Sequence, residues 1–310
     1  MNCSIIIRAY NEEKHLGRLL EGIRHQTLKD VEIILVDSGS TDSTVEIAES
    51  YGARLVKIPS EEFTFGRSLN FGVREATYEY LVIASAHVYP VYPDWLASLM
   101  HPLLDGQVAL TYGKQRGPAS AKFSEQQIFH QWFPETSNLR QETAFCNNAN
   151  AAIRKSIWKK NPYDETLTGF EDLAWGKWAK EHGYAIAYVA EAEVIHVHHE
   201  TPRAVFNRYR REAMAFKRIH PESHFSIYDF ARLTATNIAS DVWHAARERA
   251  LWRNLGSIFW FRLMQFHGTR LGHRQAGLVT PQLRETFYYP REKKPKTERK
   301  REVEPIQYQK

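Results

Sequence analysis

Short β-branched or leucine-rich runs alternate with amphipathic stretches along the first 85 residues. Ser4-Ile-Ile-Ile7 is the first run; Asn11 is the expected cap of the helix that follows, whose apolar positions 16, 19, 20 and 23 have the spacing of one helix face. The strand pattern returns at 32–36, 54–58 and 80–84, with helical patterns between. Strands separated by helices predict right-handed crossovers and a parallel sheet.

Polar segments follow three of the predicted strands, at the edge where such a sheet binds its ligands. They are Arg8-Ala-Tyr-Asn-Glu12, Asp37-Ser-Gly-Ser-Thr-Asp42 and Ser85-Ala-His-Val-Tyr-Pro90. Further strands are expected around 108–112 and 187–196, with a segment rich in Trp, Phe and Asn between them. The predicted fold class is α/β, and these strand ends are the places to search for chemistry.

Composition and charge divide the chain. With 43% apolar residues, 310 residues suffice for a sizeable core and about two domains, at roughly 100–200 residues each. Residues 1–202 hold 19 Lys/Arg against 26 Asp/Glu, whereas residues 203–310 hold 22 against 10. We therefore expect an acidic domain over 1–202, a basic helical region with interleaved aromatic residues over 203–290, and a disordered basic tail over 291–310.

The chain carries few signs of a secreted or membrane-spanning protein. Cys3 and Cys146 allow at most one disulfide, so a reducing compartment is the simpler expectation. The start does not resemble a signal peptide, and the apolar stretch Ser257-Ile-Phe-Trp-Phe261 is closed by Arg262, short of the roughly 18 residues of a membrane span. A cytoplasmic location is expected, either soluble or attached peripherally to the inner face of a membrane.

The loop from Asp37 to Asp42 has the composition of a nucleotide or anion site. Thr41 or Asp42 caps the next helix, whose N–H groups favour an anion, and the Asp37 carboxylate can accept hydrogen bonds from a nucleobase or ribose. An ordinary capped turn explains the same residues equally well. The chain lacks G-x-G-x-x-G and G-x-x-x-x-G-K-[ST], which disfavours dinucleotide-binding and P-loop enzymes.

Two carboxylates, Glu171 and Asp172, begin an apparent helix. Capping accounts for one of them, whereas the pair suits a site where one carboxylate takes a proton and the other orients a hydroxyl or a cationic group. His196 and His198 share one face of a strand end, a spacing that packs or meets solvent more often than it binds metal. A metal site there needs a further ligand, which His87 would supply.

Five segments occur in a fixed order over residues 1–202. They are Ile5-Ile-Ile-Arg-Ala-Tyr-Asn-Glu-Glu13, Glu32-Ile-Ile-Leu-Val-Asp-Ser-Gly-Ser-Thr-Asp-Ser-Thr44, Phe65-Gly-Arg-Ser-Leu-Asn-Phe-Gly72, Asn147-Asn-Ala-Asn-Ala-Ala-Ile-Arg154, and Gly169-Phe-Glu-Asp172 through Val194-Ile-His-Val-His198. In this order the segments resemble family 2 glycosyltransferases, which have the nucleotide-sugar-binding GT-A fold. Within that family they are most similar to bacterial rhamnosyltransferase-like enzymes of surface-polysaccharide assembly.

The resemblance implies roles for the matching residues. Asp172 would be the base that deprotonates the acceptor hydroxyl for direct, inverting attack on the anomeric carbon of the sugar, and Glu171 would orient the acceptor. Asn148 and Asn150 would line the donor or acceptor side. The residues implied on the nucleotide and donor side are Ala9, Tyr10 and Glu12 in the pocket, Asp37 at the base, Arg67 at the nucleotide or its phosphates, and Ser85 and His87.

The sequence departs from the family at the metal site. An Asp-x-Asp that usually holds Mg²⁺ or Mn²⁺ on the diphosphate reads Ser85-Ala86-His87 here. Because Mg²⁺ prefers oxygen ligands, a site of His87 with His196 or His198 would suit Mn²⁺ or a softer ion. The alternative is that His87 as imidazolium, or nearby Arg and Lys side chains, neutralises the leaving diphosphate without a divalent cation.

Three functions compete for the basic, aromatic region 203–290. Its helices fit peripheral attachment to an anionic membrane surface, where a lipid-linked acceptor would lie. They fit equally a scaffold that only packs on the acidic domain. Binding to nucleic acid has the right charge, but no recognisable module supports it.

The function predicted from these observations is an inverting, hexosyltransferase-like glycosyltransferase. It would move a sugar from a nucleotide-sugar donor to a saccharide or lipid-linked acceptor, in polysaccharide or glycoconjugate biosynthesis. The alternatives are a nucleotidyltransferase, which the missing Gly-rich, Lys-bearing phosphate loop disfavours, and a catalytically silent nucleotide-sugar-binding protein that has lost its metal carboxylates.

Overall fold

An eight-stranded sheet forms the centre of the computed structural model, which describes residues 2–198, 201–275, 277 and 280–288. The predicted tail over 291–310 lies outside the described residues, as does His199. The strand order is β3-β2-β1-β4-β7-β6-β8-β5. The strands are β1 (Cys3–Ala9), β2 (Val31–Asp37), β3 (Arg54–Lys57), β4 (Tyr80–Ser85), β5 (Val88–Pro90), β6 (Val108–Arg116), β7 (Asn150–Arg154) and β8 (Ala185–His196).

The first four strands run parallel, as the strand–helix alternation predicts. The β1 strand pairs in parallel with β2 and β4, and β2 with β3. The β7 strand is antiparallel to both β4 and β6, while β6 and β8 are parallel. This arrangement brings the end of β8 beside the short β5, which is antiparallel to it.

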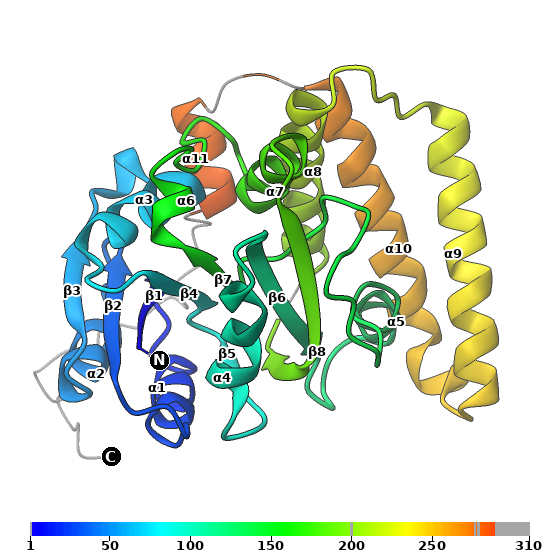
Figure 1. The fold of residues 1–310 in the computed structure, drawn as a ribbon. Coiled ribbons are helices and arrows are strands. Elements are labelled where there is room, and N and C mark those ends of the chain that lie inside the picture. The colour runs from blue at the N-terminus through cyan, green and yellow to red at the C-terminus, as the bar shows by residue number, and fades with distance from the viewer. Residues whose placement is uncertain (1, 199–200, 276, 278–279, 289–310) are drawn as a thin grey trace, which may run out of the picture.

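Helices cover both faces of the sheet (Figure 1). The period-2 pattern of β1 explains the layers: Ile5 and Ile7 face the core built on α1 and α4, and Ile6 faces the core built on α3 and α7. The helices of this part are α1 (Leu16–Arg24), α2 (Thr44–Ser50), α3 (Phe65–Glu75), α4 (Trp95–Met100), α5 (Phe123–Trp132), α6 (Lys155–Trp158) and α7 (Glu171–Glu181).

The prediction that Asn11 caps the first helix is wrong. His15 occupies the N-cap, and α1 begins at Leu16. Asn11 instead has a left-handed backbone with φ 54°, and its side-chain oxygen accepts a hydrogen bond from the Thr41 N–H at 2.8 Å. Asn tolerates this conformation well, so the residue ties the first polar loop to the second.

Within the described ranges, four helices follow the sheet: α8 (Pro202–Ile219), α9 (Ile227–Arg247), α10 (Leu251–Arg274) and α11 (Pro281–Tyr288). The backbones of α8 and α10 are in contact at two glycines of α10. A Cβ on Gly268 would lie 2.4 Å from Phe206 O and one on Gly272 would lie 2.3 Å from Arg210 O, so only glycine fits at these positions. The helical pair α9–α10 extends along one side of the molecule, and α11 returns to lie near α3 and α7 (Figure 1).

A buried ion pair joins α9 to α10, and its arginine also contacts α5 of the sheet domain. Arg262 on α10 donates two hydrogen bonds to Asp241 on α9, at 2.7 and 2.8 Å, and the two side chains are 5% and 2% exposed. The same guanidinium contacts Ser124 O on α5 at 3.4 Å. No described helix is both long and apolar enough to cross a membrane.

Candidate active site

The start of α7 holds the two predicted catalytic carboxylates side by side. Phe170, the residue before them, has a left-handed backbone with φ 54°, a rare conformation for a bulky residue. Both carboxylates are buried. Asp172 Oδ2 accepts a hydrogen bond from Asn148 N at 3.0 Å and Oδ1 accepts one from Leu173 N at 2.8 Å, so the backbone orients the carboxyl group.

Burial raises the pKa of Asp172 from 3.8 to about 7, with the nearby charge of Glu171 as the next cause. The two backbone N–H groups and Arg8 act in the opposite direction. A carboxyl group with a pKa near neutrality exchanges protons readily at the pH where most enzymes work. The arrangement therefore suits Asp172 to a role as general base.

Arg8, at the end of β1, is a site residue that the sequence analysis did not single out. Its Nη1 lies 3.1 Å from Glu171 Oε1, and both side chains are largely buried. The guanidinium also stacks over the Phe65 ring, with Cζ 4.6 Å from the ring centroid. Asn148 Nδ2 donates to the same Glu171 oxygen at 3.4 Å, so Asn148 lies beside the carboxylates.

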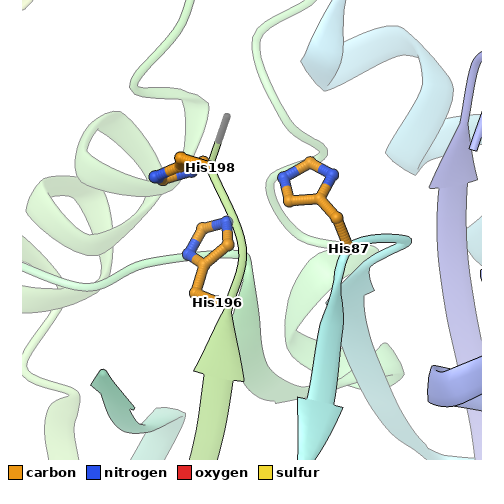
Figure 2. A group of neighbouring side chains, drawn as sticks. All are labelled: His87, His196 and His198. Carbon is orange, nitrogen blue, oxygen red and sulfur yellow. The ribbon is translucent and has the colours of Figure 1, made fainter. Parts of the chain in front are cut away.

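The three predicted histidines meet across the gap between two strand ends (Figure 2). His196 ends β8, His198 follows it, and His87 lies in the turn between β4 and β5. Each offers a ring nitrogen within 4.8 Å of those of the other two. Burial, and then the neighbouring charges of the other two histidines, lower the pKa of His196 well below 6.5, so this ring is neutral at pH 7.

In each of the three rings, Nδ1 forms a hydrogen bond with a side-chain oxygen. The three pairs, with their distances, are His87 with Glu12 Oε1 at 2.7 Å, His196 with Gln115 Oε1 at 2.7 Å, and His198 with Glu125 Oε1 at 2.6 Å. His196 Nε2 is buried and has no hydrogen-bond partner in the part of the chain that the structure describes. Oxygen atoms on Nδ1 fix ring orientation and leave Nε2 to face a ligand.

One face of α8 completes the site. Arg203, Asn207, Arg208 and Arg211 line the same cavity of about 950 Å³ as the histidines and the α7 carboxylates. Arg208 Nη1 lies 3.2 Å from His198 Nδ1. Part of the basic region therefore faces the α7 carboxylates. Residues of α11 close another part of the cavity wall: Glu285, Thr286 and Phe287.

Three residues predicted for the site have their polar groups engaged elsewhere. Both oxygens of Asp37 accept hydrogen bonds from Ser40 N at 3.2 Å, and Oδ2 also from Gly39 N at 3.0 Å, which closes the turn. Arg67 forms ion pairs with Glu165 and Glu62. The Asn150 amide is buried in the sheet, where it bonds Trp95 Nε1 and Ala192 O.

The structure places the remaining predicted residues at the strand ends. Ser85 and His87 line the cavity. Glu12 reaches it through His87. Ala9 is buried at the end of β1, where its carbonyl accepts from Ser38 N at 3.1 Å, and Tyr10 follows it.

Comparison with known proteins bears on both family and fold. The model of the family described as "Glycosyl transferase family 2" matches residues 4–161. The O-antigen chain rhamnosyltransferase RfbN of Salmonella typhimurium strain LT2 is 28% identical over 228 residues, 67% of this chain and 70% of that protein. The corresponding WbaN of Salmonella anatum is 28% identical over 225 residues, 66% of this chain and 69% of that protein.

Solved structures share the architecture at low sequence identity. A mannosyltransferase from Pyrobaculum calidifontis, in complex with GDP-Man and Mn²⁺, superposes with a TM-score of 0.60 at 17% identity, covering 88% of this chain and 87% of the other. Glucosyl-3-phosphoglycerate synthase from Mycobacterium tuberculosis, in complex with Mn²⁺, UDP and glucosyl-3-phosphoglycerate, gives 0.54 at 17% identity, covering 72% of this chain and 81% of that chain. At these identities the likeness establishes a common GT-A-like fold.

Proposed function

The chain belongs to glycosyl transferase family 2, and on that premise we propose that it transfers a sugar from a nucleotide-sugar donor with inversion, using Asp172 as the base. The observation that carries the proposal is the buried Asp172 at the start of α7, oriented by Asn148 N and Leu173 N and with a pKa of about 7. Its relatives RfbN and WbaN are described as O-antigen chain rhamnosyltransferases, and the product here would be a polysaccharide of that kind.

The chemistry follows from the atoms at the site. Asp172 takes the proton of an acceptor hydroxyl as that oxygen forms a bond to the anomeric carbon. The bond from this carbon to the diphosphate breaks at the same time, and the nucleoside diphosphate leaves with the electron pair. Glu171, held by Arg8, orients the acceptor, and the neutral amide of Asn148 suits a sugar hydroxyl.

Asp172→Asn tests the base. We expect nucleoside diphosphate release from a panel of GDP-, UDP- and dTDP-sugars to fall by roughly 10²- to 10⁴-fold, the usual contribution of a general base. Affinity for the nucleoside diphosphate should be unchanged in calorimetry. Asp94→Asn, an exposed carboxylate on the N-cap of α4, is the matched control. Transfer that survives in Asp172→Asn would exclude this residue as the base.

The histidine cluster fits a divalent cation. Its three ring nitrogens lie within 4.8 Å of one another, Nδ1 of each ring is held by an oxygen, and the buried His196 Nε2 has no hydrogen-bond partner among the described residues. We propose that His87, His196 and His198 would hold the ion, which would offset charge on the diphosphate. An all-nitrogen donor set favours Mn²⁺ or a softer ion over Mg²⁺.

Calorimetric titration of the chelator-treated protein with Mn²⁺, Zn²⁺ and Mg²⁺ tests this site without depending on activity. Mn²⁺ or Zn²⁺ should bind and Mg²⁺ should not, and His196→Ala should abolish binding. The control is His25→Ala, a surface histidine of α1. Unchanged metal binding in His196→Ala, together with chelator-resistant transfer, would instead favour neutralisation of the diphosphate by Arg208 and its neighbours.

We also propose that the joint between α9 and α10 attaches the protein to an anionic membrane surface. Trp243 and Trp252 are 54% and 87% exposed there. Arg247 stacks on Trp243, with Cζ 4.6 Å from the ring centroid. Arg249 and Arg253 are exposed beside them. Exposed tryptophans among arginines suit the headgroup region of a bilayer, where a lipid-linked acceptor would be presented.

A further inference from the structure

One cation of the cavity, Arg211 on α8, has no role in the chemistry described so far. It lines the cavity together with Glu171 and Asp172. Among the described residues no carboxylate forms an ion pair with it, and its Nε is buried without a hydrogen-bond partner. Keeping a charged group partly away from water is costly unless an opposite charge meets it.

The protein holds this guanidinium in place without neutralising it. Arg211 Cζ lies 4.7 Å from the centroid of the Phe65 ring and 6.0 Å from that of Tyr288. The Arg211 carbonyl accepts a hydrogen bond from Thr168 Oγ1 at 2.8 Å, which fixes the helix against the loop that precedes Glu171. A stacked guanidinium keeps its N–H donors in a fixed plane, ready for a carboxylate or phosphate.

The polar partners differ among three arginines of the cavity, although Arg8 and Arg211 both stack on the Phe65 ring. Arg8 is paired with Glu171, and Arg208 reaches His198 at the histidine cluster. Arg211 lies one turn further along α8, where it contacts Phe65 and approaches Gly169. Arg211 lies beside the loop that leads into α7, where the proposed base Asp172 would meet the acceptor hydroxyl, and this position assigns Arg211 to the acceptor side of the cavity.

We propose that Arg211 binds an anionic group of the acceptor, a phosphate, a diphosphate or a carboxylate, while Asp172 takes the proton of the acceptor hydroxyl. This inference rests on the proposed function, since it assigns the two ends of the cavity to donor and acceptor. It narrows the acceptor to an anionic molecule, either a phosphate-linked one or an acidic saccharide.

Calorimetry on wild type, Arg211→Gln and Arg211→Lys separates the donor end from the acceptor end. GDP, UDP and dTDP are titrated first. The protein is then titrated with inorganic pyrophosphate, farnesyl diphosphate and glucuronate, both free of nucleotide and saturated with the nucleotide that binds best. Pyrophosphate tests binding of a diphosphate alone, and farnesyl diphosphate tests binding of a diphosphate that carries a lipid chain. Glucuronate tests binding of a carboxylate on a sugar.

We expect at least one of these anions to bind the nucleotide-saturated wild type and to bind Arg211→Gln roughly 10- to 100-fold more weakly, as for the loss of a charge-assisted pair. Arg211→Lys should retain part of the affinity, and nucleotide affinity should stay within about twofold. Arg24→Gln, an exposed arginine of α1, is the control. Thermal unfolding checks that each variant folds.

Three results would overturn the inference: an equal loss of nucleotide affinity in Arg211→Gln, equal anion binding by wild type and Arg211→Gln, or no anion binding by the nucleotide-saturated wild type. Failure of the proposed function is recognised separately, because no nucleoside diphosphate would then bind. The titrations on nucleotide-free protein still decide whether Arg211 is an anion site in that case.

Discussion

The protonation state of Asp172 at the start of α7 decides whether this carboxyl group can accept a proton. Glu171 and Asp172 occupy the first turn, where a helix ordinarily stabilises carboxylates. Burial outweighs that effect at Asp172, whose pKa rises to about 7. The sequence predicted this pair as catalytic, but the size of the pKa shift depends on burial, on Glu171 and Arg8, and on the Asn148 N–H.

The pH profile of transfer should therefore have an acid limb near pH 7. Asp172 must be ionised to accept the acceptor proton, so kcat should fall about tenfold per pH unit below that value and level off above it. Steady-state rates between pH 5 and 9 in a mixed buffer measure this limb. A limb near pH 4 would mean that the carboxyl group keeps the pKa of an exposed aspartate.

Arg8→Met should move the acid limb upward by roughly one pH unit, because loss of the nearby cation favours protonation of the carboxylate pair. Arg8→Lys keeps the charge and should restore much of the profile. Rates across pH 6–9, with thermal unfolding as the check on folding, compare the variants. A reduced kcat with an unmoved limb would show that Arg8 acts on the substrate instead.

At the scale of elements, α8 connects the C-terminal helices to the catalytic cavity. Two glycines of α10 allow the backbones of α8 and α10 to touch. Another face of α8 places Arg208 and Arg211 at the cavity. The periodicity of residues 202–219 predicts a helix but leaves open which face meets which neighbour.

Gly268→Ala tests this contact against Gly256→Ala on the same helix. A Cβ at 268 would lie 2.4 Å from Phe206 O, whereas a Cβ at 256 would meet nothing within 4 Å. We expect Gly268→Ala to lower the free energy of unfolding by about 1–3 kcal/mol and Gly256→Ala to raise it by about 0.5–1 kcal/mol. Urea unfolding measures both; equal stabilisation by the two changes would contradict the close packing.

At the scale of the whole molecule, the arginines of the basic region occupy two kinds of place. Arg203, Arg208 and Arg211 face the cavity, whereas the arginines at the α9–α10 joint face solvent. Packing of the region on the sheet domain, one of the three expectations, is seen in the Arg262–Asp241 pair and its contact with Ser124. Membrane attachment stays a prediction.

The triple variant Arg247→Gln/Arg249→Gln/Arg253→Gln should bind vesicles containing phosphatidylserine roughly 100-fold more weakly than wild type, at about 1 kcal/mol per arginine. Cosedimentation at low and high salt measures the partition coefficient, and neutral vesicles should bind both proteins equally. The matched control Arg24→Gln/Arg74→Gln/Arg140→Gln removes the same charge from exposed sites elsewhere. An equal loss of vesicle binding in the control would indicate that the net positive charge of the protein, and not the α9–α10 joint, attracts it to the vesicles.

Local patterns carried much of the prediction. The order of strands and helices through residue 85, the polar loops at the strand ends and the carboxylate pair of α7 all follow from spacings of a few residues, and the family and fold match what they implied. The short strand β5 at 88–90 was not predicted. The limit of prediction from local patterns is seen at three residues, Asn11, Arg67 and Asn150. Their residue types suited a cap or a site, but their partners lie 30, 98 and 42 residues away.

The sequence by itself determined the α/β order, the split between an acidic and a basic part, and the chemistry available at Asp172 and at the histidines. Only the tertiary structure decided that Arg8 meets Glu171 across 163 residues, that oxygens hold all three histidines, and that one face of α8 carries Arg211 into the cavity. The reason is physical: periodicity within one segment fixes its conformation, whereas contacts between distant segments depend on how helices pack and chains turn in three dimensions.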